Sequence, residues 1–420
     1  MAERSFWNPM TNLGAFRERG MTIVRGDGST VWDDAGNALL DVSAALWYCN
    51  VGYGRGELAD AAAAQMRELA SYKTYDGFTS PKTEELAARV AGLVPFKGAK
   101  VFFTSGGGES IDTAAKLARA YWVAVGKPDK HTVISRQFAY HGSNAYGTSL
   151  TGMQPLVEGY GRLVPEVEQV AWDDAEALAA AIERIGAERV CAFFAEPIIG
   201  AGGVMIPPEG YLDRVQEICR EREVLLVLDE VITGFGRTGW WFATERFGLS
   251  PDLITVAKGI TSGYIPLGGV IASARVAEPF WAEGTSNVFR HGFTYAGHAT
   301  ACAVALANLD VIEREGLVAR VRELEVALAE TLAPLADHDA VAEVRSGVGL
   351  LGAVELKDPS KLQAVIDAAY ERGVLVRGIR GVALQLSPPF VITEDELAAT
   401  GRVLREALDV AATTSARSRP

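Results

Sequence analysis

Two residues that could do chemistry together, Asp229 and Lys258, each follow a short apolar run of the sequence. Residues 224–228 (VLLVL) precede Asp229, and residues 253–257 (LITVA) precede Lys258, which is followed at once by Gly259. Runs of this length and composition favour strands that are buried on both faces of a sheet. Ligand sites in open α/β sheets lie beyond the carboxyl ends of such strands. Both side chains are therefore expected at one edge of the same sheet.

The pair has a specific use that neither residue has alone. A lysine at a strand end is either a capping cation or an amine placed for Schiff-base chemistry. An aspartate there commonly caps the next turn. Opposite a Schiff-base lysine, however, Asp229 can keep a pyridine nitrogen protonated, so that the ring accepts electrons from a carbanion. Val231 would lie under such a ring, or else it is an ordinary core valine.

A glycine turn at 105–108 (SGGG) lies between an expected strand at 100–104 and a helical pattern that begins directly after it. Unpaired backbone N–H groups at a helix start bind phosphate, helped by the positive end of the helix dipole. Glycine lets the backbone approach a ligand closely. Many glycine turns merely reverse the chain, so this segment is a candidate anion site.

The segment 138–142 (FAYHG) follows another expected strand, which ends at Ser135. Tyr140 could stack on an aromatic ligand here, and His141 is the only histidine close to these strand ends in the sequence. A histidine beside a tyrosine is more often structural than catalytic. We therefore do not assign His141 as the base.

The composition is that of a soluble enzyme and disfavours several partners. The chain has 420 residues, 49% of them hydrophobic and 22% charged, and this length predicts two or more domains. Its net charge of -13 provides no basic surface for nucleic acid or an anionic membrane. Cys49, Cys191, Cys219 and Cys302 are too scattered for paired metal-ligand spacing, so no metal is expected. Without a signal-peptide pattern or an apolar run of about 20 residues, we expect a cytoplasmic protein.

Alternating strands and helices place these groups in one large domain. Such alternation implies an α/β fold with a mostly parallel sheet covered on both faces. We place this domain at residues 56–300, and a smaller α+β domain at residues 1–55 and 301–420. The expected strands of the large domain are 100–104, 132–135, 190–195, 224–228, 253–257 and 269–272. The expected helices are 58–71, 81–93, 175–185 and 211–221, followed by a helical region at 299–335 with a break near Gly316.

The smaller domain is expected to combine strands from both ends of the chain. Turn-rich strands near 22–32 fit an antiparallel meander. In the aromatic and glycine-rich segment 45–56, Trp47 and Tyr48 line a cavity or belong to an aromatic core. Only the tail at 413–420 (TTSARSRP) is expected to be disordered. Towards the C-terminus we expect strands at 342–345, 350–355, 374–377 and 383–386, with helices at 362–372 and from 394.

A lysine, a carboxylate, a phosphate cradle and a stacking aromatic together are what pyridoxal phosphate needs. Residues 229–260 (DEVITGFGRTGWWFATERFGLSPDLITVAKGI) resemble the signature of class III, or ω-, aminotransferases, which are fold type I pyridoxal-phosphate enzymes. Lys258 lies 29 positions after Asp229, as this family expects. The resemblance covers essentially the whole chain, from FWNPMT at 6–11 to SPPF at 387–390. It is closest to the amine or ω-amino acid:pyruvate subgroup.

This resemblance implies a role for each of the strand-end residues. Lys258 would carry the cofactor as a Schiff base and then act as base and acid of the proton shift. Asp229 would pair with the pyridine nitrogen. Val231 would pack on one face of the ring, and Tyr140 would stack on the other.

The phosphate and subunit contacts are implied in the same way. Gly107 and Gly108 would hold the phosphate through their backbone amides. Thr294, in the segment HGFTYAGHATACA, matches a threonine that reaches the phosphate of the neighbouring subunit's cofactor, which implies a homodimer or a dimer of dimers. Glu196 would support the residues that touch the cofactor.

Two departures from the family pattern lie in these segments. The family usually has Ser or Thr in the phosphate turn, where this chain has only glycines, so one hydroxyl hydrogen bond is missing or replaced by water. Such a loss weakens cofactor retention by roughly 0.5–1.5 kcal/mol. Ala299 stands where a proline usually follows the histidine, here His298, and we expect this change to be tolerated.

The resemblance implies transamination between a primary amine or ω-amino acid and a keto acid, with pyruvate as the expected acceptor. Trp47, Tyr75 and Tyr140 match positions that line the pocket in the amine:pyruvate subgroup, and they suggest an amine with an apolar body. Arg377 is expected to bind the acceptor carboxylate bidentately. Arg380 is the competing position, and a plain surface charge is the alternative role. The sequence leaves open the amine itself, its stereochemistry, and the choice between dimer and tetramer.

Two other functions remain as alternatives. An aminomutase or a decarboxylase on the same scaffold differs only in which bond is aligned for cleavage. Pyruvate-dependent transfer distinguishes the aminotransferase from a decarboxylase, which releases carbon dioxide. A non-catalytic binding protein would not need Lys258 and Asp229 together, and both are present.

Overall fold

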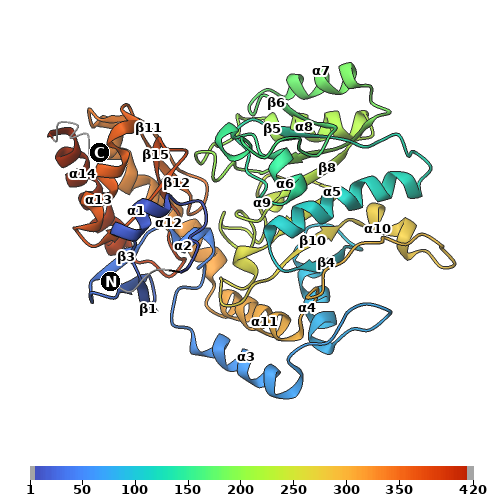
Figure 1. Cartoon of the computed structure of the whole chain (residues 1–420), viewed down its shortest axis with the longest axis horizontal. Helices are drawn as coiled ribbons and strands as arrows, with labels where there is room; N and C mark the ends of the chain where they lie inside the picture. Colours follow the sequence, from blue (N-terminus) through green and yellow to red (C-terminus); the bar gives the residue numbers. More distant parts are fainter. Residues whose placement is uncertain (1–4, 414–420) are drawn as a thin grey trace.

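A seven-stranded sheet forms the centre of the larger half of the molecule (Figure 1). The computed structural model describes residues 5–413. In spatial order the strands are β4 (Lys100–Thr104), β10 (Gly268–Ala272), β9 (Leu253–Val256), β8 (Leu225–Asp229), β7 (Val190–Ala195), β5 (Thr132–Arg136) and β6 (Val167–Val170). All neighbours run parallel except β10, which is antiparallel to β4 and β9. The predicted mostly parallel sheet is confirmed. The edge strand β6 was not predicted, because Glu168 and Gln169 interrupt its apolar pattern.

Helices cover both faces of this sheet, because its central strands are buried on two sides. Successive strand residues point to opposite faces: Val133 packs with α5 residues, whereas Ile134 packs with residues of α7 and α8. One face carries α5 (Gly107–Ala124), α6 (Ala145–Leu150) and α10 (Ala274–Trp281). The other face carries α4 (Pro81–Leu93), α7 (Ala175–Ile185), α8 (Tyr211–Glu221) and α11 (Ala299–Arg314).

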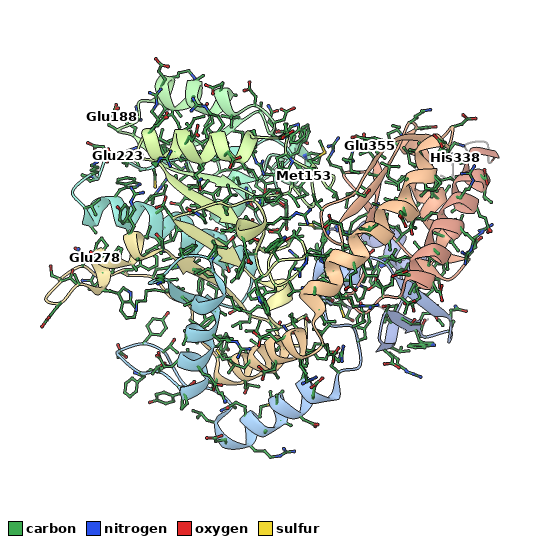
Figure 2. The ribbon with its side chains drawn as sticks, turned by 180° about the vertical axis from the view of Figure 1, so that it is seen from behind. Met153, Glu188, Glu223, Glu278, His338 and Glu355 are labelled. Carbon is green, nitrogen blue, oxygen red and sulfur yellow. The ribbon has the colours of Figure 1, made fainter. Side chains whose placement is uncertain are left out.

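The smaller half combines segments from both ends of the chain and contains two four-stranded sheets. One sheet consists of β1 (Ile23–Asp27), β2 (Thr30–Asp33), β3 (Ala38–Asp41) and β13 (Val374–Leu375). The other consists of β11 (Val341–Arg345), β12 (Gly352–Leu356), β15 (Ala383–Leu386) and β14 (Arg377–Ile379). The helices α12 (Leu317–Leu332), α13 (Leu362–Tyr370) and α14 (Glu394–Thr413) accompany them. In the view from behind, His338 and Glu355 mark this half, and Glu188, Glu223 and Glu278 mark the larger one (Figure 2).

The predicted strand at 374–377 is divided in the structure. β13 pairs with β3 in one sheet, and β14 pairs with β15 in the other. The chain therefore crosses between the two sheets at Val376. Local sequence pattern predicts extended backbone here, but it does not say which partner strand each residue takes.

Helix α11 connects the two halves. It packs against α3 (Gly56–Leu69) and α4, while α12, which follows Gly316 at a φ of 62°, packs against α14. Residues of α11 contribute to the core of both halves. The domain limits at 55 and 300 stay a prediction.

Three short α-helices, in addition to short 3-10 helices, lie elsewhere in the described part of the chain: α1 (Leu13–Arg19), α2 (Ala44–Trp47) and α9 (Ala243–Arg246). No helix among residues 5–413 combines the length and apolarity that crossing a membrane requires. Within the same residues, no group of three or more His, Cys, Asp or Glu is arranged to hold a metal ion. The predicted disordered tail lies outside the described residues, apart from Thr413, which ends α14.

Candidate active site

A cavity of about 610 Å³ is lined by residues that follow the carboxyl ends of β4, β5, β7, β8 and β9. Parallel strands end at the same edge of a sheet, so residues far apart in the sequence meet there. The predicted site residues that line this cavity are Gly107, Gly108, Tyr140, Glu196, Asp229, Val231 and Lys258.

Lys258 stands at the start of a tightly fixed turn after β9. It begins the short 3-10 helix η2 (Lys258–Ile260), with a φ of 47° in the left-handed region. A Cβ at Gly259 would lie 2.5 Å from Asn50 Nδ2, so only glycine fits beside the lysine. Asn308 Nδ2 donates to the carbonyl of Gly259 at 2.9 Å. The surrounding backbone therefore fixes where the lysine side chain begins.

The amine of Lys258 is free to react. Among the described residues, its Nζ has no hydrogen-bond or ion-pair partner. Burial lowers the pKa of this amine below its ordinary value, although the nearby charges of Asp229 and Glu196 act in the opposite direction. A lowered pKa enlarges the neutral fraction of a lysine, and the neutral amine is the nucleophile.

Asp229 ends β8, and its carboxylate is held on both oxygens. Its Oδ2 lies 2.8 Å from His141 Nδ1, while its Oδ1 accepts from Thr255 Oγ1 at 3.0 Å and from the backbone N–H of Val231 at 3.1 Å. Only 5% of Asp229 is exposed. A buried carboxylate with three donors has one orientation, and it can place a negative charge against a cationic ring nitrogen.

His141 has a structural role that the sequence analysis did not assign. An ionised carboxylate only accepts hydrogen bonds, so the ring of His141 donates from Nδ1 to Asp229. His141 is 1% exposed, and its Nε2 has no partner within the described residues. The sequence did contain a signal for this contact. His141 follows β5, and the ends of neighbouring parallel strands lie at one edge of the sheet, where Asp229 also lies. The structure makes His141 a residue that orients Asp229.

The start of α5, where the sequence predicts a phosphate cradle, leaves its first backbone amides unpaired. Gly106 is the N-cap and offers no side-chain cap. The backbone N–H groups of Gly107 and Gly108, the first two helical residues, have no partner in the described chain. A Cβ at Gly107 would come within 3.0 Å of Val231 Cγ1. Unpaired amides at the positive end of an 18-residue helix suit a phosphate group.

Glu196 holds the backbone of two neighbouring segments. Its Oε1 accepts from the N–H of Tyr140 at 3.0 Å, and its Oε2 accepts from the N–H of Gly200 at 2.9 Å. Burial raises the pKa of Glu196, and the negative charge of Asp229 adds to this shift, while His141 opposes it. Glu196 therefore fixes the place of Tyr140 at the cavity wall.

Trp47 lies beside the cavity rather than in its lining. It is 3% exposed and packs in the core, whereas Leu46 and Tyr48 line the cavity. Ala44, Ala45 and Trp47 all have positive φ angles within α2, which changes the direction of consecutive side chains. The sequence analysis left both Trp47 and Tyr48 open between a cavity and an aromatic core, and it missed Leu46, because no local pattern indicates such a backbone.

Neither candidate arginine lines this cavity. The guanidinium of Arg377 lies 4.8 Å from the ring centroid of Trp47, and its Nη1 is 3.4 Å from Gln385 Oε1. Burial lowers the pKa of Arg377. Arg380 is exposed and donates to the carbonyl of Gly202 at 3.0 Å. Of the two, Arg377 is the more buried.

Tyr75 and Thr294 lie away from the cavity that contains Lys258. Tyr75 lines a second cavity of about 510 Å³, together with residues such as Phe78, Trp281 and His291. Thr294 is exposed. Within one chain, the structure therefore does not bring these two predicted residues to the site.

Comparison with known proteins identifies the family. The sequence profile described as Aminotransferase class-III matches residues 15–408. The chain is a class-III aminotransferase. Among curated relatives, it is 39% identical to putrescine–pyruvate aminotransferase of Pseudomonas aeruginosa, over 96% of this chain and 93% of the relative. It is 36% identical to omega-amino acid–pyruvate aminotransferase of Pseudomonas putida, over 96% of both chains.

Solved structures of transaminases share the fold of this class-III aminotransferase. An amine transaminase from an uncultivated Pseudomonas species, in its pyridoxal-phosphate-bound form, matches with a TM-score of 0.93 at 38% identity, over 97% of this chain and 99% of the other. An (S)-enantioselective omega-transaminase from Thermomicrobium roseum matches with a TM-score of 0.92 at 40% identity, over 96% of both chains.

Class-III aminotransferases depend on pyridoxal phosphate, and the residues present fit this cofactor. The polar groups left without partners at the cavity include the Lys258 amine and the amides that begin α5. They correspond to the aldehyde and the phosphate of pyridoxal phosphate. The buried Asp229 carboxylate offers the charge that its ring nitrogen needs.

Proposed function

We propose that this class-III aminotransferase transfers the amino group of a primary amine or ω-amino acid to a keto acid, with pyruvate as acceptor. One observation carries the proposal: a free lysine amine, a fixed carboxylate and the unpaired amides of a helix start face the same cavity. The two curated relatives support the choice of acceptor, because pyruvate is part of both names.

The proposal assigns one task to each residue at the cavity. When bound, pyridoxal phosphate supplies an aldehyde and an electron-accepting ring that make the hydrogen on the amine-bearing carbon acidic. Lys258 Nζ, whose pKa is lowered by burial, removes that proton and later returns it. Asp229 keeps the proton on the ring nitrogen, and Gly107 and Gly108 bind the phosphate through their amides. Tyr140 and Val231 confine the ring from its two sides.

Several apolar side chains also line the cavity and suit an amine with an apolar body. They help to keep water from the reacting carbon. These side chains are Leu46, Ile232, Ile265, Pro266 and Leu267.

The carboxylate of the keto acid requires a cation. Arg377 is our candidate, because it is partly buried, stacks on Trp47, and interacts electrostatically with Tyr140 at the cavity wall. Its planar guanidinium can bind a carboxylate through two hydrogen bonds. Trp47 would then act by supporting Arg377 rather than by touching the amine.

A homodimer would bring Thr294 and Tyr75 to the partner's site. Both lie on a face with large exposed apolar side chains, which is unusual for the free surface of a monomer. A two-fold arrangement places the same patch on both subunits. Exposed apolar residues that lie together here are Tyr75, Phe78 and Trp281, which line the second cavity, and Tyr72, whose ring contacts Phe78.

The cytoplasm is the compartment we propose for this enzyme. All four cysteines are buried free thiols, and thiols persist in reducing compartments.

A panel of amines with pyruvate as acceptor tests the activity. We expect alanine to form from at least one of three classes: a diamine, an ω-amino acid or an aryl amine. Lys258→Ala should fold, lose the visible absorbance of bound cofactor, and form no alanine. Alanine formation by this variant at the wild-type rate would remove Lys258 from its role. Carbon dioxide release without alanine would instead favour the decarboxylase alternative.

A further inference from the structure

The phosphate cradle lacks a side-chain donor of its own. Residues 106–108 are all glycine, so the helix start offers only backbone amides. A phosphate monoester carries three strong acceptor oxygens and close to two negative charges. Amides at one helix end leave part of this hydrogen-bonding capacity open to further donors, besides the Thr294 hydroxyl that we propose comes from a second subunit.

The side chain of Asn144 is next to the cradle. A Cβ built on Gly108 would lie 3.3 Å from Asn144 Cγ and Oδ1, and 3.5 Å from Nδ2. The amide therefore occupies the space that a side chain at position 108 would take. Asn144 lines the cavity that holds Lys258. Its side chain has no hydrogen-bond partner among residues 5–413.

The surrounding segment explains why this amide is free and why it stays in place. Asn144 is the N-cap of α6 but makes no capping hydrogen bond. Asp112, on α5, caps α6 instead: its Oδ1 accepts from the N–H groups of Tyr146 at 3.0 Å and Gly147 at 3.2 Å. The side chain of Asn144 is thus not needed to satisfy its own helix.

The backbone of the same loop is pressed against the start of α5. Gly142, two residues before Asn144, has a φ of 94°, and a Cβ on it would lie 3.0 Å from the Cα of Gly108. Only glycine permits so close an approach at this φ. The loop and the cradle are therefore packed backbone against backbone at this point.

We propose that Asn144 Nδ2 donates a hydrogen bond to the phosphate of pyridoxal phosphate, in place of the hydroxyl that the glycine turn lacks. Gly108 and Asn144 act as a pair, because the glycine leaves the room that the amide fills. This inference rests on the proposed use of the α5 start as the phosphate site.

Cofactor binding without turnover tests this role. Wild-type and Asn144→Ala apoproteins are titrated with pyridoxal phosphate and, separately, with pyridoxal, and bound cofactor is followed by its visible absorbance. We expect Asn144→Ala to weaken binding of pyridoxal phosphate about tenfold, as for one hydrogen bond to a charged group. Binding of pyridoxal, which has no phosphate, should not change. An equal loss for both ligands, or no loss for either, would overturn the proposal.

Further variants separate the phosphate contact from other effects. Asn144→Asp places a carboxylate beside the phosphate, so it should weaken pyridoxal phosphate more than Asn144→Ala does and leave pyridoxal unaffected. Adding Gly108→Ser to Asn144→Ala restores a hydroxyl in the freed space and should recover most of the affinity. Thr148→Ala, one turn along α6 and outside this cavity, is the matched control and should bind as wild type does.

Two outcomes distinguish this inference from the proposed function. Ser105, which also lines the cavity beside the turn, is the alternative side-chain donor. A tenfold loss in Ser105→Ala with none in Asn144→Ala would give the contact to Ser105 and overturn our assignment. If the wild-type protein binds neither ligand covalently at Lys258, the proposed function fails first, and the phosphate contact fails with it.

Discussion

Three hydrogen-bond donors converge on the carboxylate of Asp229: the ring of His141, the hydroxyl of Thr255 and the backbone N–H of Val231. Such an arrangement leaves the carboxylate no freedom to rotate. It also keeps the carboxylate aimed in one direction, as electrostatic stabilisation in a buried site requires. The residue that the sequence singled out for its position therefore works only with two partners from other strands.

Replacing the charge of Asp229 should slow the half-reaction with an amine far more than it weakens binding of the cofactor. In Asp229→Asn, we expect cofactor to bind Lys258 while the half-reaction with an amine slows by about a hundredfold or more, because the ring nitrogen loses its charge partner. Single-turnover absorbance of the bound cofactor measures this rate directly. Asp252→Asn, which alters a buried aspartate outside the cavity, is the comparison. A half-reaction at the normal rate in Asp229→Asn would remove Asp229 from its role.

The buried amine of Lys258 makes a prediction about pH. Its folded pKa is lowered from 10.5 by burial. Between that lowered value and 10.5, Lys258 binds more protons in the unfolded chain than in the folded one. The folded apoprotein therefore gains stability as pH rises through this window. Below the window, the free-energy cost of burying the charged amine is fully present. Lys258→Met removes the penalty. We expect the Met apoprotein to melt at a higher temperature than wild type at pH 7, with the difference shrinking toward pH 10.

Thermal melts of the two apoproteins across this range provide the measurement. Lys82→Met, which alters an exposed lysine on α4, is the control and should show no such dependence on pH. A Met variant that is less stable than wild type at pH 7, or a difference that grows with pH, would contradict the assignment of Lys258 as a buried amine.

At the scale of elements, strands and helices with periodic patterns were predictable, and so was the part of the site they carry. β8, β9 and the start of α5 follow from local apolar runs and glycine, and their ends meet because parallel strands share an edge. The split between β13 and β14 and the turned backbone of α2 were not predictable, because partner choice and positive φ angles depend on distant contacts. Arg377 and Trp47 lie in these two segments, which is why sequence placed them less well than Lys258.

The start of α5 should tolerate no side chain at Gly107. A Cβ there would lie 3.0 and 3.3 Å from the two methyl groups of Val231, which is itself fixed beside Asp229. Gly107→Ala should therefore shift the helix start or Val231 and weaken binding of pyridoxal phosphate severalfold, with a loss of roughly 1–3 kcal/mol in stability. Absorbance titration and chemical denaturation measure the two effects.

Gly92→Ala is the matched control for this substitution. Gly92 lies in α4, where a Cβ would meet nothing within 4 Å. Alanine there should raise the free energy of unfolding by up to about 1 kcal/mol through helix propensity, and it should not change cofactor affinity. If Gly107→Ala behaved like Gly92→Ala, close packing at the cradle would not be a requirement of the site.

At the scale of the whole molecule, the two halves are fastened together beside the cavity. Arg237, from the loop after β8, is fully buried and donates to the carbonyls of Leu350 and Pro388 and to Asn50 Oδ1. Its guanidinium also lies 4.7 Å from the ring centroid of Phe390. These partners come from the two ends of the chain. The N-terminal segment that supplies Leu46 and Tyr48 to the cavity is thereby held against the large sheet.

Thr294 lies outside this unit, and we propose that a second subunit brings it to a cofactor. The segment around it is exposed beside Tyr295 and the second cavity. A subunit that lacks Lys258 could still lend its Thr294 to a neighbour. A subunit with a negative charge at position 294 would weaken phosphate binding in the neighbour's site, but its own Lys258 could still act.

Mixed dimers of Lys258→Ala and Thr294→Asp should therefore regain activity that neither variant has alone. In a mixed dimer, the site with the intact Lys258 receives Thr294 from the other chain, while the second site lacks both. Random assembly makes half of the dimers mixed, and each mixed dimer has one intact site out of two. Co-refolding should therefore give about one quarter of wild-type activity. Rates measured before and after mixing, with each variant refolded alone as the control, decide the matter. If Thr294 acts within its own chain, the mixture stays inactive.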